Sequence, residues 1–487
     1  MNQNCRLSED ERQFFLADAS FFEQYCGCMS GLKFSRRSFL KTLGAAALTA
    51  PFITRNLISA PPSSRVRYAA FGSANMARAD INSIISHPNV DFVAVADVDS
   101  SYLAGIKKDL EGKFPNLRTY DDYRKLLDKE KDLDCVSVTT PDHCHAVMAM
   151  SAMQLGINVY CQKPLAHDIY EVRALTNYAK KKKLVTQMGI QIHSNDVYRT
   201  TVNMIQSGII GKIKETHSWC GNRHWGSTDP KPTASDPVPS TLNWDLWLNT
   251  ASYRPFVKDI YHPGNWRKVQ DFGTGIFGDM GCHIFDPVFK ALELTAPIQV
   301  RSEGPRPNDY FWGLKTEMHY IFPGTKYTAE KTIPVYWYDG PGERPPKHIM
   351  ELVPNMPTLG SIFIGEKGVL VIPHIGAPVV YMKNGDKYEE FEDDDVLQKL
   401  ALPSLNHWHQ FVDAVQGKGK TTAGFDYSGP LTESVLLGSI ACKFPKTTLK
   451  WNSKSLKFNL AEANKKFKPA NELVKREYRA GWKVKGL

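Results

Sequence analysis

The sequence has few of the patterns that mark metal proteins, disulfide-stabilised proteins or membrane proteins. Its nine cysteines include no CxxC pair and no zinc-like spacing. No apolar run is long enough to span a bilayer, and no repeat of about 20 to 50 residues is present. We therefore expect free thiols, no bound metal and no stable membrane anchor.

Charge of neither sign is concentrated enough to indicate a nucleic-acid-binding surface. The formal charge of +9 is spread over 487 residues, and the densest basic runs, residues 180–183 and 464–467, are short. A lysine run at the end of a helix is favoured by the helix dipole and is usually solvated. The sequence thus predicts a globular protein of two or three domains with no nucleic-acid partner.

An export signal is indicated near the N-terminus. The stretch SRRSFLK, residues 35–41, matches the twin-arginine pattern at every position, and the apolar stretch that follows is short and alanine-rich. We predict a leader over residues 1–60, recognition by the twin-arginine export machinery, and a periplasmic or otherwise exported protein. The chain could instead start at Met29, which would give a signal of conventional length. The alternative to an export signal is that Arg36-Arg37 merely begin an amphipathic helix.

Short apolar runs alternate with helical patterns between residues 66 and 189. The predicted strands are residues 66–72, 90–97, 134–140, 157–162 and 184–189. The predicted helices are residues 75–86, 99–112, 121–129, 142–155 and 168–182. This alternation predicts an α/β fold with a Rossmann-type, doubly wound parallel sheet, which we assign to residues 61–190.

The first predicted strand ends in a phosphate-binding type of turn. Gly72-Ser73-Ala74-Asn75-Met76 resembles GxGxxG, with the turn glycine kept and a small alanine where a pyrophosphate would approach the next helix. Asp97 lies 25 positions after Gly72, where a carboxylate binds ribose hydroxyls and repels a 2′-phosphate. These residues predict an NAD site, with NADP less favoured; alternatively, Asp97 caps the helix that begins near Asp99.

The segment TTPDHCH, residues 139–145, should lie at the nicotinamide half of this site. Ligands of open parallel sheets bind beyond the carboxyl ends of the strands, so we expect Thr140, Pro141 and His145 to contact the cofactor. A metal site at His143 and His145 is the alternative. It lacks an acid or cysteine at matching spacing, and we predict no metal.

The first candidate catalytic group is Lys163, which directly follows the predicted strand over residues 157–162. Lys163 lies in the sequence Gln162-Lys163-Pro164, and a lysine at the carboxyl end of a parallel strand points into the cofactor crevice. There it can form a hydrogen bond with a substrate hydroxyl. We expect Gln162 and Lys163 to contact the cofactor as well.

The second candidate is the motif GDMGCHIFD, residues 278–286. Asp279 and His283 are spaced i, i+4, so on a helix they share one face, and the carboxylate can orient the imidazole as a base. A helix N-cap and a core histidine are the alternative interpretation. Pro287 predicts a bend just beyond the pair.

These motifs together resemble the Gfo/Idh/MocA family of sugar and polyol oxidoreductases. The resemblance runs from about residue 65 to residue 445 and rests on Asp97 and on FGSANM, TTPDHCH, VYCQKPLAHD, QSGIIGKIKE and GDMGCHIFD, in the family's order. It implies catalytic roles for Lys163, Asp279 and His283. It also implies a second α+β domain with an open, mostly antiparallel sheet and a homo-oligomer, a dimer or tetramer. The leader is similar to that of the exported glucose-fructose oxidoreductase branch, whose cofactor stays bound; Gln162 departs from the family's usual glutamate.

Beyond residue 190, polar and apolar residues alternate as in one-sided antiparallel strands. We assign residues 191–450 to this substrate-binding and oligomerisation domain and residues 451–487 to a C-terminal extension. Helices predicted near residues 404–416 and 430–442 should pack back on the first domain. Aromatic loops at residues 222–226 and 243–267 fit either a sugar site or an oligomer interface, and we predict that His262, Trp266 and Arg267 bind substrate.

The sequence therefore predicts an exported NAD-dependent oxidoreductase that transfers hydride between a secondary hydroxyl of a sugar or glycoside and a tightly bound cofactor. An NAD-dependent glycosidase or lyase that cleaves a glycoside through a transient 3-keto sugar would use the same residues. A non-catalytic sugar-binding protein on the same fold is a third hypothesis.

Overall fold

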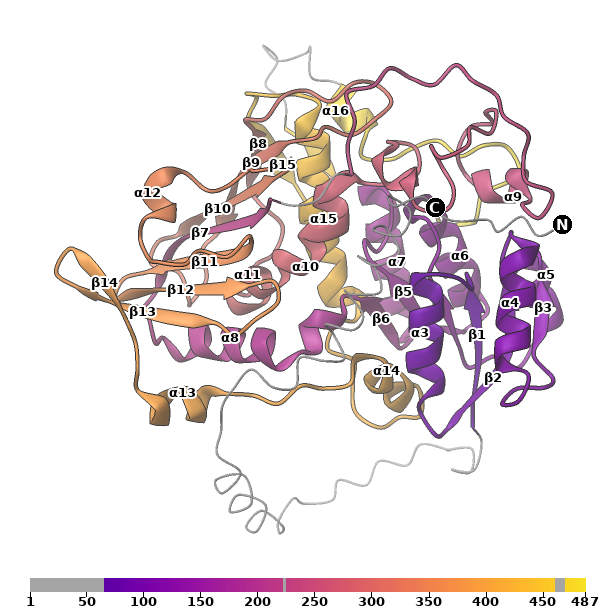
Figure 1. Ribbon diagram of the computed structural model, residues 1–487, viewed down its shortest axis with the longest axis horizontal. Helices are drawn as coiled ribbons and strands as arrows, with labels where there is room; N and C mark the ends of the chain where they lie inside the picture. Colours follow the sequence, from indigo (N-terminus) through magenta and orange to yellow (C-terminus); the bar gives the residue numbers. More distant parts are fainter. Residues whose placement is uncertain (1–64, 222–224, 460–468) are drawn as a thin grey trace, which may run out of the picture. The chain divides into compact units, whose positions relative to one another are not determined.

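The computed structural model describes residues 65–221, 225–459 and 469–487, so the predicted leader lies outside the described residues. The first half of the chain forms a six-stranded parallel sheet in the order β3-β2-β1-β4-β5-β6, seen at the indigo end of the chain in Figure 1. Its strands are β1 (Val66–Phe71), β2 (Val90–Ala96), β3 (Arg118–Tyr120), β4 (Cys135–Val138), β5 (Asn158–Gln162) and β6 (Thr186–Gly189). The predicted Rossmann-type sheet is confirmed; β3 was not predicted.

The helices between these strands follow the predicted segments. They are α3 (Met76–Ile85), α4 (Ser100–Leu110), α5 (Tyr123–Lys129), α6 (Asp142–Gln154) and α7 (Ile169–Lys182). Helix α7 begins in a capping box formed by Asp168 and Glu171, and its last turn contains the lysine run predicted to lie at a helix end. The strand order changes direction between β1 and β4, which is where such sheets bind dinucleotides.

The second half is built on a ten-stranded sheet, ordered β14-β13-β12-β11-β7-β10-β9-β8-β15-β16. Only the β7–β10 pair is parallel, so the predicted mostly antiparallel sheet is confirmed. Its strands are β7 (Ile213–Cys220), β8 (Gln299–Ser302), β9 (Thr316–Pro323), β10 (Thr332–Asp339), β11 (Leu359–Gly365), β12 (Gly368–Pro373), β13 (Val379–Asn384), β14 (Lys387–Glu390), β15 (Leu449–Asn452) and β16 (Lys457–Phe458).

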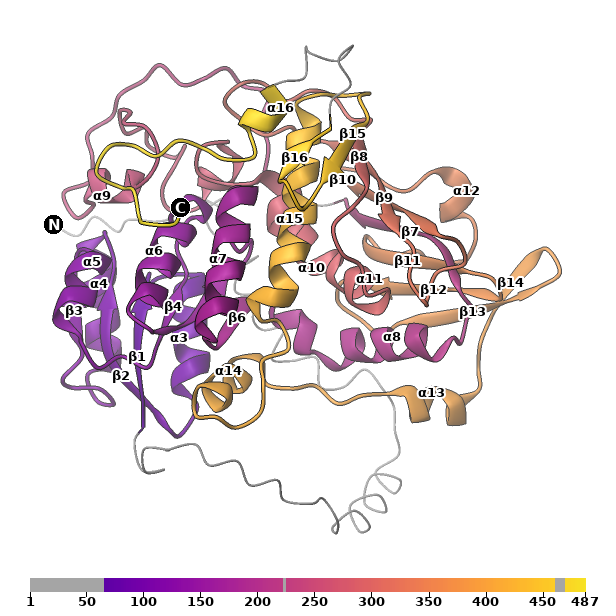
Figure 2. The same ribbon diagram turned by 180° about the vertical axis from the view of Figure 1, so that it is seen from behind.

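Some of the remaining helices and short turns lie against this sheet and others lie beside the parallel sheet, as the view from behind shows (Figure 2). The longer ones are α8 (Asp196–Ser207), α11 (Asp286–Ala291), α13 (Asp394–Leu400), α14 (His407–Val415) and α15 (Phe425–Cys442). The shorter ones are α9 (Trp244–Leu248), α10 (Cys282–Ile284), α12 (Lys347–Met350), the 3₁₀ turns η1 (Gln191–Ser194) and η2 (Asn265–Lys268), and the π-helical turn η3 (Phe277–Gly281).

Helix α15 lies between the two sheets (Figure 1). A Cβ atom on Gly429 would lie 2.2 Å from Thr176 Oγ1 of α7, so glycine permits the close approach of these two helices. On the other side, the Tyr320 hydroxyl of β9 donates to the Ser434 carbonyl at 2.9 Å. The prediction that this helix packs back on the first domain is confirmed, although it starts at Phe425 and contains Pro430.

The segment over residues 469–487 packs against the helices of the parallel sheet. It starts with α16 (Pro469–Glu472). Further along, Arg476 Nε donates to Glu171 Oε1 at 2.8 Å, and Arg479 forms an ion pair with Asp245. Trp482 is buried beneath the guanidinium of Arg124, 4.3 Å from its ring centroid. The extension therefore fastens α7, α5 and the segment around α9 together.

All six cysteines in the described part of the chain are buried and unpaired, as predicted: Cys135, Cys144, Cys161, Cys220, Cys282 and Cys442. None of the helices in the described ranges is long and apolar enough to cross a membrane.

Candidate active site

The turn after β1 forms a backbone cradle beside a cavity. Gly72 has φ +95°, and a Cβ atom there would lie 2.2 Å from the Thr139 carbonyl oxygen, so only glycine fits. Helix α3 starts directly after the turn, at Met76. The adjacent cavity has a volume of about 540 Å³, and Ser73, Ala74 and Asn75 contribute to its lining. The residues present therefore fit the phosphate-binding turn of a dinucleotide.

Asp97 stabilises this turn through hydrogen bonds. Its Oδ2 accepts hydrogen bonds from Ser73 N at 2.9 Å and Ser73 Oγ at 2.8 Å, and its Oδ1 accepts one from Asp99 N at 3.0 Å. Burial raises the pKa of Asp97, and these hydrogen bonds oppose the rise. The residue that caps α4 is Asp99, not Asp97, so the capping alternative for Asp97 is wrong. His262, predicted to bind substrate, lies at this end of the crevice, with Nε2 3.4 Å from Asp99 Oδ2.

The two histidines of TTPDHCH, His143 and His145, lie within hydrogen-bond distance of backbone carbonyl oxygens of neighbouring loops. His145 is buried, and its two ring nitrogens lie 2.8 Å from the Thr140 carbonyl oxygen and 2.9 Å from that of Pro164. It thereby joins the loops after β4 and β5. His143 Nε2 lies 3.1 Å from the Trp247 carbonyl oxygen, and burial lowers the pKa of His143 to about 3. Within the described ranges no cluster of residues could hold a metal ion.

Asp142 connects this loop to the segment that carries Asp279. Asp142 begins α6, and its Oδ2 accepts a hydrogen bond from Thr274 Oγ1 at 2.7 Å. Thr274 packs on Gly278, where a Cβ atom would lie 1.8 Å from its hydroxyl oxygen. Burial raises the pKa of Asp142 to about 7. A carboxyl group that titrates near neutral pH therefore lies next to the residues around Asp279.

The structure brings Lys163 and Asp279 together. Lys163 Nζ lies 2.6 Å from Asp279 Oδ1, and each side chain is 14% exposed. Lys163 follows β5, whereas Asp279 lies in the π-helical turn η3, a geometry that the sequence did not reveal. The helix is interrupted at Phe285 before Pro287 enters α11, so the predicted bend is confirmed. A π turn inside a helical segment is often found at functional sites.

Two further side chains hold the Asp279 carboxylate. Trp225 Nε1 donates to Oδ2 at 2.9 Å, and Arg267 Nε lies 3.4 Å from Oδ1. The Arg267 guanidinium lies 5.3 Å from the ring centroid of Trp225 and 4.5 Å from that of Trp266. We call Lys163, Trp225, Arg267 and Asp279 the Asp279 cluster. The Asp279 carboxylate is thus surrounded by two cationic side chains and an indole N–H.

His283 lies one helical turn after Asp279 and is buried. Its ring centroid is 5.9 Å from that of His374, whose Nδ1 lies 3.0 Å from the Tyr198 hydroxyl. An orienting contact from Asp279 to His283 stays a prediction.

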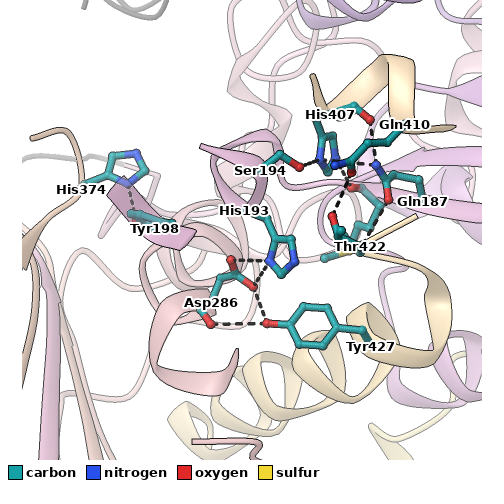
Figure 3. A network of polar contacts seen from close by, with 12 residues as sticks. Gln187, His193, Ser194, Tyr198, Asp286, His374, His407, Gln410, Thr422 and Tyr427 are labelled. Atoms are coloured by element: carbon teal, nitrogen blue, oxygen red, sulfur yellow. Dashed lines mark hydrogen bonds and ion pairs between the residues drawn. The ribbon is translucent and has the colours of Figure 1, made fainter. Parts of the chain in front are cut away.

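A network of polar side chains lies around Asp286, three residues after His283 in the sequence (Figure 3). Asp286, at the start of α11, lies 2.8 Å from His193 Nδ1 and accepts a hydrogen bond from the Tyr427 hydroxyl. Nearby, His407 Nε2 lies 2.9 Å from the Met188 carbonyl oxygen and can donate to it. Its Nδ1 then accepts from the Ser194 hydroxyl at 2.8 Å. None of these side chains was singled out by the sequence, because the partners lie far apart along the chain.

Gln162 is buried beside Asp80. It is 5% exposed, and its Nε2 donates to Asp80 Oδ2 at 2.8 Å. A direct contact between Gln162 and the cofactor stays a prediction.

The predicted site residues thus divide into two groups. The structure gathers Lys163, Asp279 and Arg267 beyond the carboxyl end of β5, with His283 one turn away and Trp266 buried beneath Arg267. It places Asp97 and His262 beyond the carboxyl end of β2. Trp225 was contained in the aromatic loop over residues 222–226 but was not predicted to contact Asp279.

A parallel sheet carries a dinucleotide turn and a lysine after β5, and a second sheet domain contributes an acid that contacts this lysine. These features define the class of nicotinamide-dependent oxidoreductases. Comparison with known families agrees. Residues 66–190 match the NAD-binding Rossmann fold of the Gfo/Idh/MocA oxidoreductase family, and residues 199–323 match the family's C-terminal alpha/beta domain. The two matches cover just over half of the chain, which therefore belongs to this family.

Several curated relatives are similar over part of their length. An inositol 2-dehydrogenase/D-chiro-inositol 3-dehydrogenase of Lactiplantibacillus plantarum is 25% identical over 221 residues, covering 44% of this chain and 57% of the relative. A levoglucosan dehydrogenase of Pseudarthrobacter phenanthrenivorans is 28% identical over 167 residues, covering 34% of each chain. A glycosyl hydrolase family 109 protein of Bacteroides fragilis is 33% identical over 138 residues, covering 26% of this chain and 29% of the relative.

Solved structures share the fold over a longer span. The WlbA dehydrogenase of Chromobacterium violaceum, in complex with NADH and UDP-GlcNAcA, aligns with a TM-score of 0.56 and 14% identity, covering 82% of this chain and 99% of that one. The aldose-aldose oxidoreductase of Caulobacter crescentus aligns with a TM-score of 0.54 and 14% identity, covering 80% of this chain and all of that one (100%).

Proposed function

We propose that this protein is an NAD-dependent oxidoreductase that transfers hydride between a secondary hydroxyl of a sugar or glycoside and a tightly held cofactor. The observation that carries the proposal is the 2.6 Å contact between Lys163 and Asp279. It joins the carboxyl end of β5 to the turn η3, which directly precedes the α10 segment that carries His283. The sugar and polyol dehydrogenases among the relatives support the substrate class.

The chain's own residues can perform the proton chemistry. The Lys163 ammonium donates a hydrogen bond to the substrate hydroxyl oxygen and favours the loss of its proton. His283 accepts that proton, and Asp279 holds Lys163 in place as its counter-charge. The turn from Gly72 to Met76, Asp97, Thr140 and Pro141 would hold the cofactor. A nicotinamide bound in the crevice supplies the hydride acceptor.

NAD in preference to NADP is supported by Asp97. Its carboxylate faces the turn after β1, where a 2′-phosphate would meet a second negative charge. Binding of each cofactor to the apo-protein, followed by intrinsic tryptophan fluorescence, tests the preference. Tighter binding of NADP would contradict it.

The activity itself is tested with purified protein and a panel of sugars, polyols and glycosides. We expect at least one member of the panel to reduce the cofactor, either added NAD or a cofactor that copurifies. The absorbance at 340 nm measures this reduction. Lys163→Ala should abolish turnover while NAD still binds. Unchanged turnover in this variant would revive the interpretation as a sugar-binding protein without catalysis.

Redox-assisted glycoside cleavage is the second candidate, favoured by the glycosyl hydrolase family 109 protein among the relatives. Oxidation at C3 acidifies the C2 proton, which permits elimination of the C1 substituent before the ketone is reduced again. Glycoside cleavage without net cofactor reduction would support it. A released 3-keto sugar would support the dehydrogenase instead.

We also propose that the protein is exported by the twin-arginine route and forms a dimer or tetramer. The SRRSFLK stretch supports export, and the open ten-stranded sheet supports assembly. Cell fractionation of the wild type and of an Arg36→Lys/Arg37→Lys variant tests export, with cytoplasmic retention expected for the variant. Light scattering of the purified protein tests the assembly.

A further inference from the structure

A buried carboxylate lies beneath the Gln162-Lys163 turn. Asp80, on α3, is fully buried (0% exposed). Four side chains donate hydrogen bonds to it: Thr139 Oγ1 at 2.9 Å, Gln162 Nε2 at 2.8 Å, Trp408 Nε1 at 2.8 Å and Tyr160 Oη at 3.3 Å. The carboxylate therefore joins α3, the ends of β4 and β5, and α14 at one point.

All of these donors are neutral, and in the described part of the chain no ion pair reaches Asp80. Burial raises the pKa of Asp80, and the four hydrogen bonds oppose the rise. The other titratable groups that face it, the phenols of Tyr68 and Tyr160 and the thiol of Cys161, are themselves buried with raised pKa values, so they stay neutral. A buried charge without a counter-ion depends on its hydrogen bonds.

The Gln162 amide is fixed by two contacts of opposite polarity. Its NH₂ donates to Asp80, and its Oε1 accepts from the Lys163 backbone N–H at 3.3 Å. Gly189 of β6 leaves the space that the amide occupies, because a Cβ atom there would lie 2.5 Å from Nε2. A glutamate at this position would place two carboxylates in contact inside the protein, where both cannot stay ionised.

We propose that Asp80 is a positioning residue for Lys163: it orients the Gln162 amide, whose carbonyl holds the Lys163 backbone so that the ammonium reaches Asp279. The acid at position 80 and the amide at position 162 form a matched pair. Asp80 acts through Gln162 and touches neither substrate nor Asp279.

The test exchanges the two groups between the positions. In Asp80→Asn, an amide NH₂ can face the Gln162 NH₂, so that two donors meet where a donor and an acceptor met before. In Gln162→Glu, a second carboxylate lies against Asp80. In the double variant Asp80→Asn/Gln162→Glu, an amide again faces a carboxylate, and the carboxylate introduced at position 162 can still accept the Lys163 N–H. We expect each single change to lower kcat about 10-fold or more, since small displacements of a catalytic group are costly. The double variant should recover to within about 3-fold of the wild type.

A second readout needs no substrate and so does not depend on the proposed function. In Gln162→Glu the two acids share a proton, so the folded state binds it more tightly than the unfolded chain does. Its thermal midpoint should fall as the pH rises above the ordinary glutamate pKa of about 4.3, and the double variant should lose this slope. Gln398→Glu, on the exposed face of α13, is the control for added charge alone: its acidic neighbours Asp394 and Asp395 are solvent-exposed, so no buried pair of carboxylates forms.

Failure of Gln162→Glu to fold at neutral pH, with recovery at low pH or in the double variant, would support the pairing. A double variant no better than the worse single one, in both kcat and thermal slope, would overturn it. Restored thermal behaviour without restored kcat would reduce Asp80 to a residue of the fold and would likewise overturn its role in positioning Lys163.

Discussion

The two ends of the parallel sheet's carboxyl edge, at β1–β2 and at β5, are built in different ways. At the β1–β2 end, Asp97 is held by Ser73 and by the backbone of Asp99, two residues away. At the β5–η3 end, Asp279 is held by side chains from three separate segments, and Lys163 lies 116 positions earlier. The first end is therefore built within one β1–α3–β2 unit, whereas the second exists only in the complete fold. Substitutions at the first should change cofactor affinity, and those at the second should change the rate.

The largest effect is expected from Asp279→Asn. The change removes the counter-charge of Lys163 and Arg267 while keeping the shape of the side chain. We expect kcat to fall by about 10²- to 10⁴-fold, with NAD affinity nearly unchanged. Turnover and cofactor binding measured on one preparation check this, and a selective loss of NAD binding would abolish the distinction between the two ends.

Asp97→Ala probes the opposite end. It leaves the Ser73 N–H, the Ser73 hydroxyl and the Asp99 N–H without their acceptor. We expect NAD affinity to fall by about 10- to 100-fold, with kcat at saturating NAD preserved, because each lost buried hydrogen bond costs about 1–3 kcal/mol. Calorimetric titration of the apo-protein with NAD measures the affinity, and an equal loss in kcat would contradict the prediction.

Asp142→Asn should change the pH dependence of stability. The pKa of Asp142 is raised to about 7 in the folded protein and is about 3.9 when unfolded, so the folded state binds the proton more tightly. This contribution is present below about pH 4 and is lost as the pH rises to about 7. It should amount to about 2 kcal/mol or more between pH 5 and pH 8.

Urea unfolding of the wild type and of Asp142→Asn at these two pH values measures that difference. The variant should show a flatter profile, because an amide does not titrate but still accepts from Thr274. Equal slopes for the two proteins would mean that Asp142 does not titrate in this range.

The smallest effect is expected from Trp225→Phe. The change removes the indole N–H from Asp279 but keeps an aromatic face for Arg267. Loss of one hydrogen bond to a carboxylate that keeps its two cations should lower kcat by about 3- to 10-fold, or about 1 kcal/mol. Steady-state kinetics with the best substrate of the panel would measure it, and a loss as large as that of Asp279→Asn would show that the indole is indispensable.

The comparison also explains what the sequence could predict. The turn at Gly72, Asp97 and the five long strands were predicted because their signals are local: a small residue at a tight turn, a carboxylate after a strand, apolar runs of strand length. Strand β3 has only three residues, none of them buried, so it left no apolar run. The lysine and the acid–histidine pair were found through their motifs and the family resemblance.

The rest of the site depends on distances that a sequence does not contain. Nothing local pairs Trp225 with Asp279 or Gln162 with Asp80, and the π-helical geometry of η3 has no sequence signal of its own. His262 and Arg267 lie five positions apart in one aromatic loop, and only the path of that loop sends them to opposite ends. The ion pairs of Arg476 join residues about three hundred positions apart.

Helix α15 has a consequence for motion. Its Gly429 packs against α7, beside the parallel sheet. On its other side, the Ser434 carbonyl accepts a hydrogen bond from the Tyr320 hydroxyl of the ten-stranded sheet. A hinge rotation between the two halves of the chain would have to separate α15 from α7. These helices pack so closely at Gly429 that even a Cβ atom would not fit between them. Entry and release of substrate should therefore use displacements of the aromatic loop that carries Trp266 and Arg267, with the two sheets staying fixed as one block.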